Sequence, residues 1–351
     1  MKKIWIDITN SPHAIFYNAM IPKIEKNGYK VVVTARDYAQ TIELLDLFDI
    51  EYKLIGKHQG KNKIKKLFGL FTRSIALIKF AKGQHFDGAL SMSSQYVMIA
   101  ARMLKIPHMT LFDYEYSTGH KISFRLSTRI LSPAGVSAEE LKKYGASMNK
   151  VTYYNGLKEQ FFINHYIKLY NNKYHGINPL KEKLNVDTSR VIIVVRPEAT
   201  VAHYQSNKNS LTADLLSYLD MHISNPLVIL LPRINSQREE YKAMNFKNVI
   251  IPEIAINGVD LVASCDLVIG AGGSMNREAA SIGIPVYTLY QGGEFCAVDN
   301  MLIETNRMIR ISKKEDFGRI NVIKRKNEIN IMGEDLSKLY ITELKGLIGD
   351  A

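Results

Sequence analysis

The segment Asp266 to Pro285, DLVIGAGGSMNREAASIGIP, constrains the fold more than any other part of the 351-residue chain. The apolar run from Leu267 to Ile269 predicts a buried strand, which leads directly into the turn Gly270-Ala271-Gly272-Gly273. Ser274 follows in the N-cap position, and residues 276–282 predict a helix that a glycine and a proline end. The segment therefore predicts a strand, a glycine turn and a helix in immediate succession.

The glycine turn and the start of the helix suit an anionic ligand. Glycine lets the backbone approach a ligand closely, and the first N–H groups of a helix attract anions. Glu278 follows the first helical turn, where a carboxylate can accept hydrogen bonds from a ribose diol. A nucleotide diphosphate bound through Gly272, Gly273, Ser274 and Glu278 is the prediction. The alternatives are a turn with no ligand and an NAD-type dinucleotide, which is disfavoured because Met275 replaces the third glycine of that motif.

The pattern GG-x-x-x-x-EA-x-x-x-G-x-P resembles the donor-nucleotide motif of GT-B fold proteins, especially the MurG-type N-acetylglucosaminyltransferases. It is also similar to the motif of the non-hydrolysing UDP-N-acetylglucosamine 2-epimerases, in which one residue fewer precedes the glutamate. The resemblance implies an α/β protein of two Rossmann-like domains that face a cleft, with Glu278 on the ribose of UDP. Along most of its length, including IDITNSPH and RPEA, the chain also resembles an archaeal and bacterial family known only as a domain of unknown function.

Composition narrows the class of protein further. The length suggests about two domains, and 46% hydrophobic residues are enough for substantial cores. Two cysteines are too few for a disulfide framework, which fits a reducing cytoplasm, and no apolar run is long enough to span a membrane. The net charge of +12 favours anionic partners such as nucleotide phosphates or an anionic membrane surface. Nucleic acid is the weakest candidate, because the sequence has no zinc-finger spacing and no RNP-like motif.

The first half of the chain predicts strands that alternate with helices, which is typical of a parallel α/β sheet. The first strand, Ile4 to Thr9, precedes a helix from His13 to Lys26, and ligands bind at the carboxyl ends of such strands. His13 is therefore a candidate general base, with a helix-start histidine bonded to nearby backbone as the alternative. Asp113 and Glu115, which follow another strand, are candidates to deprotonate an acceptor or to bind a cation, with a solvated acidic loop as the alternative.

Residues 57–82 are the strongest charge feature of the sequence. A basic amphipathic helix of this kind can lie on an anionic leaflet, and the alternative is a core-packed helix with a solvated lysine face. The lipid-linked acceptor of MurG-like enzymes implies a position at the inner face of the cell membrane. The basic residues are Lys57, Lys61, Lys63, Lys65, Lys66, Arg73, Lys79 and Lys82.

A strand that ends at Asn155-Gly156 predicts a change of domain. We expect residues 1–157 to form the acceptor and catalytic domain and residues 158–330 to form the nucleotide-sugar domain. Residues 331–351 are expected to contain a closing helix that packs back on the first domain.

Arginines follow two predicted strands of the second domain. Arg196 and Arg233 both stand at carboxyl strand ends, where a guanidinium can clamp a diphosphate, and ordinary surface ion pairs are the alternative. The resemblance to MurG implies that Gln291, Asp299 and Asn300 bind the donor sugar.

Together these patterns predict a glycosyltransferase that moves a sugar from a UDP-sugar to a lipid-linked or glycan acceptor. No D-x-D pair precedes a donor site, so metal dependence is not implied, and no cofactor is expected. One alternative is a UDP-N-acetylhexosamine 2-epimerase or hydrolase. The other is a non-catalytic nucleotide-sugar-binding protein, because a fold does not fix a function.

Overall fold

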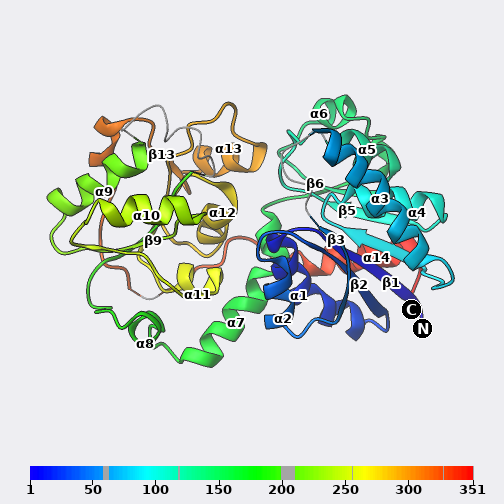
Figure 1. Cartoon of the computed structure of the whole chain (residues 1–351), viewed down its shortest axis with the longest axis horizontal. Coiled ribbons are helices and arrows are strands. Elements are labelled where there is room, and N and C mark those ends of the chain that lie inside the picture. The colour runs from blue at the N-terminus through cyan, green and yellow to red at the C-terminus, as the bar shows by residue number, and fades with distance from the viewer. Residues whose placement is uncertain (58–62, 118, 199–209, 255, 327, 351) are drawn as a thin grey trace. The chain divides into compact units, whose positions relative to one another are not determined.

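The computed structural model describes residues 1–57, 63–117, 119–198, 210–254, 256–326 and 328–350, and for residues 63–67 only the backbone. The chain divides into two compact units (Figure 1). The first comprises Met1–Phe162, Cys296–Val298 and Glu334–Ala351, and the second comprises Ile163–Phe295 and Asp299–Gly333. The roles predicted for the two domains stay predictions.

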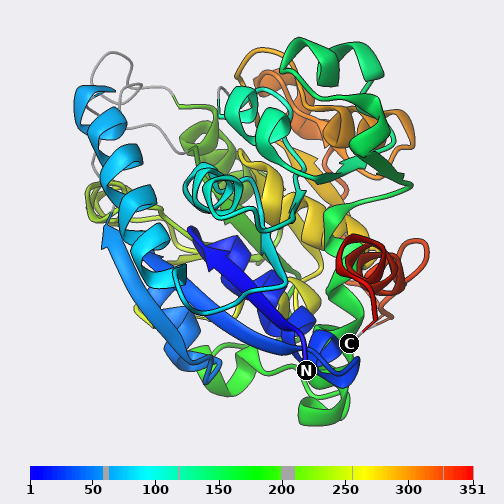
Figure 2. The same cartoon turned by 90° about the vertical axis from the view of Figure 1, so that its right-hand side faces the viewer.

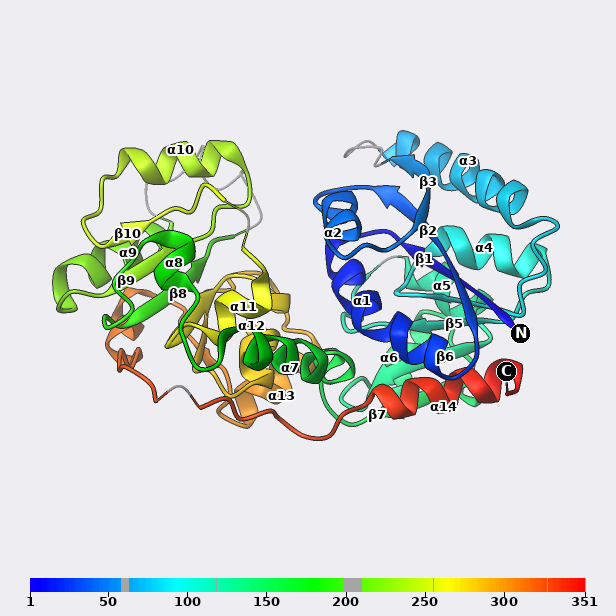
Figure 3. The same cartoon turned by 90° about the horizontal axis from the view of Figure 1, so that it is seen from below.

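A parallel sheet of seven strands, in the order β3-β2-β1-β4-β5-β6-β7, forms the centre of the first unit. Helices α3 and α4 cover one face, and α1 and α14 cover the other (Figure 3). The central strands β1, β4 and β5 are almost entirely buried, because helices cover both faces of the sheet. The elements are β1 (Lys3–Ile8), α1 (Ser11–Lys26), β2 (Lys30–Asp37), α2 (Thr41–Leu47), β3 (Tyr52–Lys57), α3 (Lys63–Ala81), β4 (Gly88–Ser91), α4 (Gln95–Met103), β5 (His108–Leu111), α5 (His120–Leu126), β6 (Arg129–Pro133), α6 (Ala138–Lys143), η1 (Met148–Lys150), β7 (Val151–Tyr154), η2 (Lys158–Phe161) and α14 (Ser337–Ile348).

The second unit has a parallel sheet of six strands in the order β10-β9-β8-β11-β12-β13. Its core packs the apolar faces of these strands against α9, α10 and the η4 turn, through residues such as Leu216, Tyr241 and Phe317. The elements are α7 (Ile163–Tyr174), α8 (Leu180–Leu184), β8 (Ile192–Arg196), α9 (Leu211–His222), β9 (Leu227–Leu230), α10 (Asn235–Ala243), β10 (Val249–Ile250), α11 (Gly258–Ala263), β11 (Leu267–Gly270), α12 (Gly273–Ser281), β12 (Val286–Thr288), α13 (Ala297–Glu304, whose first two residues belong to the first unit), β13 (Ile309–Arg310) and η4 (Lys314–Arg319).

The strand order reverses at one place in each sheet. The reversal lies between β1 and β4 in the first sheet and between β8 and β11 in the second. Open parallel sheets bind ligands outside the carboxyl ends of the strands at such switch points. The prediction of two Rossmann-like α/β domains is confirmed, and the topology directs attention to the ends of β1, β8 and β11.

Helix α3 is fixed to the first sheet by apolar and ionic contacts. Leu77 packs in one buried cluster with Trp5 and Phe86, whose rings stack at 5.4 Å between centroids. Arg73 reaches Asp7 of β1 and forms a buried ion pair at 2.8 Å. Both chain ends lie in this unit (Figure 2), where Lys2 Nζ donates to the carbonyl of Ile348 at 2.7 Å.

Two kinds of feature do not occur in the described residues. No helix in them is both long and apolar enough to cross a membrane. Nor do they contain a group of three or more histidine, cysteine, aspartate or glutamate side chains placed to hold a metal ion.

Candidate functional site

The glycine turn connects β11 to α12 in the second unit. Helix α12 begins at Gly273, and Gly272 is its N-cap with φ −144° and ψ 160°. The N-cap position predicted for Ser274 is therefore wrong: Ser274 lies inside the first helical turn. Because Gly272 is in the extended region, which any residue adopts, a need for positive φ does not explain the glycine.

Two arginine side chains lie close to these glycines. A Cβ atom on Gly272 would clash with Nη2 of Arg233, and one on Gly273 would lie 2.7 Å from Nη2 of Arg277. Real Cβ atoms essentially never come that close to another heavy atom. The turn is thus shaped so that guanidinium groups from the end of β9 and from α12 itself lie against its backbone.

Arg196 and Arg233 bring two positive charges to the switch point of the second sheet. Arg196 Nη1 donates to the carbonyl of Leu231 at 3.0 Å, and Arg233 Nε donates to the carbonyl of Pro197 at 2.8 Å. Burial, and then the charge of Arg233, lower the pKa of Arg196 to about 10. Burial also lowers the pKa of Arg233, an effect that the nearby Glu198 opposes.

Neither of these guanidinium groups has a carboxylate within ion-pair distance among the residues that the structure describes. Glu198 instead accepts hydrogen bonds from the hydroxyl of Thr212 at 3.0 and 3.1 Å. Two half-buried like charges side by side are unfavourable unless an anion joins them. The pair therefore favours an anionic ligand at the carboxyl edge of the second sheet.

Glu278 lies on α12 beyond the turn and is 8% exposed. Its Oε2 faces Gly258 at the start of α11, 3.7 Å from the place that a Cβ on Gly258 would take. Helix α12 thus carries both the turn that faces the arginines and the carboxylate predicted to bind ribose. The ribose role of Glu278 stays a prediction.

The three predicted donor-sugar residues hold other parts of the second unit. Asp299 forms an ion pair with Arg277, with Nε–Oδ1 at 2.8 Å and Nη2–Oδ2 at 3.1 Å. Asn300 Nδ2 donates to the carbonyl of Phe295 at 3.2 Å, and Gln291 Nε2 donates to the carbonyl of Leu289 at 3.3 Å. Arg277 was not among the predicted residues, although its place directly before Glu278 in the glycine-turn motif is a signal that points to it.

His13 lies at the carboxyl end of β1, at the switch point of the first sheet. Helix α1 begins at Ser11 rather than at the predicted His13, because Asn10 caps it by accepting a hydrogen bond from the backbone N–H of Ser11. The ring of His13 contacts Thr9 through Nδ1 and Oγ1 at 3.3 Å. Burial, and then the charge of Lys158, lower the pKa of His13 to about 3, so the ring is neutral near pH 7.

Both predicted acidic residues of the first unit form an ion pair or a hydrogen bond within the protein. Asp113 forms an ion pair with Lys158 at 2.6 Å, and Lys158 also lies 3.6 Å from Glu159. Glu115 is buried, and its Oε1 accepts a hydrogen bond from the backbone N–H of Ala297 at 2.7 Å, within the first unit. The structure thus brings His13, Asp113 and Lys158 into one electrostatic cluster and gives Glu115 a helix-capping contact. Nothing in the local sequence around Lys158 distinguishes it from a surface lysine.

We expect the neutral state of His13 to make the first unit sensitive to acid. The unfolded chain binds a proton near pH 6.5, whereas the folded ring does so only near pH 3, so stability falls as the pH drops through this window. The His13→Asn variant should lose about 1.4 kcal/mol per pH unit of that dependence. The facing charges of Lys158, Asp113, Arg36 and Asp7 stay in place in this variant.

Urea unfolding at several pH values measures this slope. Trp5, the only tryptophan, is fully buried in the first unit, so its fluorescence reports the unfolding of that unit. The exposed His222 in the second unit supplies the control variant His222→Asn. A slope that His13→Asn leaves unchanged would contradict the buried neutral ring.

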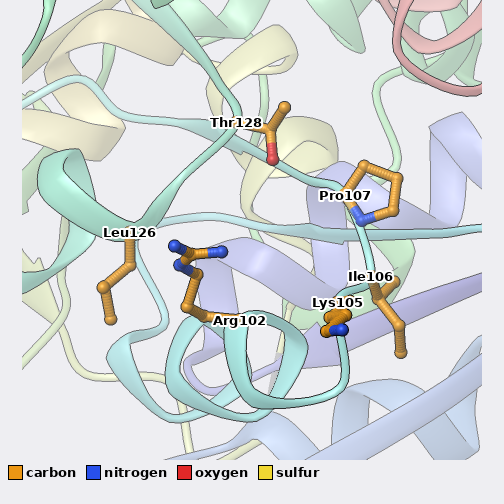
Figure 4. Close-up of a pocket in the computed structure, with 6 residues that line it drawn as sticks. All are labelled: Arg102, Lys105, Ile106, Pro107, Leu126 and Thr128. Carbon is orange, nitrogen blue, oxygen red and sulfur yellow. The ribbon is translucent and has the colours of Figure 1, made fainter.

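A cavity of about 390 Å³ opens at the opposite edge of the first sheet (Figure 4). It lies between the end of α4 and the residues that precede β5 and β6. Ligands of parallel α/β sheets bind at the carboxyl edge, and none of the predicted site residues lines this cavity. Its lining residues are Arg102, Lys105, Ile106, Pro107, Leu126 and Thr128.

Comparison with known proteins places the chain in a family. A model described as "Protein of unknown function (DUF354)" matches residues 2–344. The chain belongs to the DUF354 family. It is also 31% identical over 307 residues to the uncharacterized protein MJ0665 of Methanocaldococcus jannaschii, a match that covers 87% of this chain and 86% of that protein.

Solved structures share the GT-B fold with this DUF354 chain. A UDP-GlcNAc 2-epimerase from Neisseria meningitidis, bound to UDP-GlcNAc, has a TM-score of 0.76 at 15% identity and is covered over 99% of its length by 97% of this chain. The UDP-GlcNAc 2-epimerase from M. jannaschii has a TM-score of 0.74 at 14% identity, covering 98% of this chain and 100% of that one. Anabaena HepE, in complex with UDP and glucose, has a TM-score of 0.56 at 14% identity, covering 100% and 92%. At these identities the likeness shows the fold alone.

Proposed function

We propose that this chain is an enzyme that acts on a UDP-sugar and transfers the sugar to a lipid-linked or glycan acceptor. The single observation that carries the proposal is the pair Arg196 and Arg233, two half-buried cations that have no carboxylate partner among the described residues. They lie at the switch point of the second sheet, beside the turn that opens α12. A diphosphate supplies the two negative charges that such a pair requires.

The proposed ligand follows from what surrounds the arginines. The backbone N–H groups at the start of α12 add donors for a phosphate oxygen. Glu278 stands one helical turn further, as a carboxylate acceptor for the ribose hydroxyls. Support for uridine comes from the structural neighbours, whose structures hold UDP-GlcNAc, or UDP and glucose.

Catalysis is assigned to both the nucleotide site and the first unit. The arginines and the N–H groups of α12 would stabilise the charge that develops on the leaving UDP. His13, Asp113 and Glu115 are the proposed bases for the acceptor. A pKa of about 3 makes the ring of His13 a weak proton acceptor, so this role requires an anionic substrate beside it that raises the pKa.

Epimerisation at C2 of a UDP-N-acetylhexosamine is the second candidate reaction. It is favoured by the likeness of the fold to several UDP-GlcNAc 2-epimerases. The sequence distance between Gly272 and Glu278, which fits the MurG-type motif, favours transfer. Incubation of the chain with UDP-GlcNAc alone, followed by NMR, separates the two: an epimerase forms the C2 epimer, a hydrolase releases free sugar, and a transferase leaves the donor intact until an acceptor is added. Binding without turnover across an acceptor panel would favour a non-catalytic protein.

We expect Glu278→Gln to weaken the binding of UDP roughly tenfold, and Glu278→Ala to weaken it more. A carboxylate that accepts ribose hydroxyls forms charge-assisted bonds of about 1.5–3 kcal/mol each, and Gln keeps only one neutral acceptor. Calorimetric titration measures the affinity, with deoxyuridine diphosphate lacking the 2′-hydroxyl as a matched ligand.

The two ligands give the Glu278 experiment its control. If Glu278 binds ribose, the difference in affinity between UDP and the deoxy ligand shrinks in Glu278→Ala. Unchanged UDP affinity in a folded Glu278→Ala protein would contradict the ribose role of Glu278. That result would not test the proposed diphosphate site at Arg196 and Arg233.

A further inference from the structure

The chain contains a long segment with no negative side chain. Between Glu51 and Asp87 there is neither an aspartate nor a glutamate, whereas residues 52–86 include eight lysines and one arginine. Helix α3 occupies the middle of this segment and runs from Lys63 to Ala81. The segment therefore has no carboxylate of its own with which to neutralise its charge.

One face of α3 is apolar and open to solvent. Phe68 is 68% exposed, Phe71 59% and Ile75 51%. Positions three and four residues apart lie on the same side of a helix, so these three side chains form one stripe. The exposed Lys79 and Lys82 continue the stripe toward the end of the helix.

The opposite face of α3 is held firmly by the sheet. Arg73 forms hydrogen bonds with both carboxylate oxygens of Asp7, at 2.9 and 2.8 Å, and donates to the carbonyl of Ile55 at 2.8 Å. Leu77 is buried in the cluster around Trp5. The helix cannot turn its phenylalanines inward without breaking these contacts, and it lies on the outer side of the first unit (Figure 3).

We propose that this face, formed by Phe68, Phe71, Ile75 and Lys79 of α3 and by Lys82 directly after it, docks on the surface of an anionic lipid bilayer. The aromatic and aliphatic side chains enter the boundary between headgroups and acyl chains, while the lysines meet the anionic headgroups. A helix of 19 residues is about 28 Å long and lies in the plane of the surface. This inference does not depend on the proposed UDP-sugar activity.

Charge and polarity favour a bilayer over two other occupants. A second copy of the same face would bring lysines against lysines without any carboxylate to pair them. A nucleic acid would pair with the lysines but would leave the phenylalanines in contact with a charged phosphate backbone. A bilayer with anionic lipids satisfies both the apolar stripe and the lysines.

Co-sedimentation of the full chain with vesicles tests the proposal. Binding should be strong to phosphatidylcholine vesicles that contain phosphatidylglycerol, weak to phosphatidylcholine alone, and lower at high salt. Each lysine near an anionic surface contributes a factor of about five, so Lys79→Gln/Lys82→Gln should lower the partition coefficient about 25-fold. Phe68→Ser/Phe71→Ser should lower the partition coefficient by roughly tenfold or more, because the two phenylalanines no longer bury apolar surface in the bilayer.

Helix α7 supplies a matched control, because it also exposes a leucine and lysines. The variant Leu169→Ser/Lys168→Gln/Lys173→Gln removes the same kinds of group from the second unit and should bind vesicles as the parent chain does. Trp5 fluorescence confirms that the α3 variants remain folded. Vesicle binding that does not depend on anionic lipid, or that neither α3 variant weakens, would overturn the proposal. Two other results would also overturn it: a dimer that Phe68→Ser/Phe71→Ser dissociates, and lysine-dependent binding to polynucleotide without binding to vesicles.

Discussion

Replacement of Arg233 by Gln should weaken the binding of UDP about 100-fold. A guanidinium that pairs with a diphosphate forms two charge-assisted hydrogen bonds, and the loss of about 2.7 kcal/mol between them corresponds to that factor. Arg196→Gln should have a comparable effect, since burial lowers the pKa of both cations and the charge of Arg233 lowers that of Arg196 further. Calorimetric titration with UDP, and with uridine as a ligand that lacks phosphate, measures the difference.

The melting temperature of the ligand-free protein distinguishes a binding role from a structural one. Arg196→Gln or Arg233→Gln removes one of two neighbouring like charges, so the loss of one hydrogen bond to a carbonyl is offset and the melting temperature should change little. Arg277→Gln is the matched comparison, because Arg277 also contacts the glycine turn but forms an ion pair with the largely buried Asp299. That variant should melt at a clearly lower temperature, since it leaves a carboxylate without its cation.

The UDP and uridine affinities of these variants distinguish a phosphate site from a nucleoside site. Normal UDP affinity in a folded Arg196→Gln/Arg233→Gln protein would contradict the proposed diphosphate site. It would also remove the main support for a UDP-sugar enzyme. A loss of affinity that is the same for UDP and uridine would instead indicate that the nucleoside site, rather than a phosphate site, is damaged.

Features carried by neighbouring residues could be predicted from the sequence. The strands, the glycine turn and the arginines after β8 and β9 each occupy a few consecutive residues, and chain order together with the rule for parallel sheets brings Arg196, Arg233 and Gly272 to one edge. The α/β class with two Rossmann-like domains follows from the same local patterns.

Contacts between distant residues could not be predicted. Arg73 pairs with Asp7 across 66 positions, Lys158 with Asp113 across 45, and Arg277 with Asp299 across 22. From sequence alone, a charged side chain is expected to be exposed unless its partner is known. Lys158 is therefore expected to be an ordinary surface residue. The donor-sugar role predicted for Asp299 therefore took no account of the cation that already binds it.

The prediction that Ser274 is the N-cap of this helix was wrong. Serine is a preferred N-cap residue, whereas glycine is a neutral one, so the sequence favours Ser274. The structure begins the helix two residues earlier, with Gly272 as the N-cap in an extended conformation and with Gly273 as the first helical residue.

The largest effect on stability should come from Arg73→Met in the first unit. Asp7 is fully buried, and Arg73 is its only cationic partner within ion-pair distance in the described part of the chain. Thr34 and Ser94 donate further hydrogen bonds to Asp7 at 2.7 and 2.6 Å. Removal of one partner of a buried ion pair typically costs about 3–5 kcal/mol, because the other charge stays desolvated.

The pH dependence of stability identifies the cause of that loss. Burial raises the pKa of Asp7, but the charge and hydrogen bonds of Arg73, with those of Ser94 and Thr34, bring it below the usual value of 3.8. In the parent chain this carboxylate therefore stabilises the fold above pH 4, and the contribution is lost as the pH falls further. In Arg73→Met only desolvation and the two hydroxyl groups remain, so the pKa should rise above 3.8 and the variant should recover stability as Asp7 becomes protonated.

Urea unfolding followed by Trp5 fluorescence measures both effects, since Trp5 lies on β1 next to Asp7 in the same unit. The double variant Asp7→Asn/Arg73→Met removes both charges and should regain part of the lost stability, because the buried charge is gone while Asn still accepts from Thr34. A double variant no more stable than Arg73→Met would mean that the buried charge of Asp7 is not the cause of the lost stability.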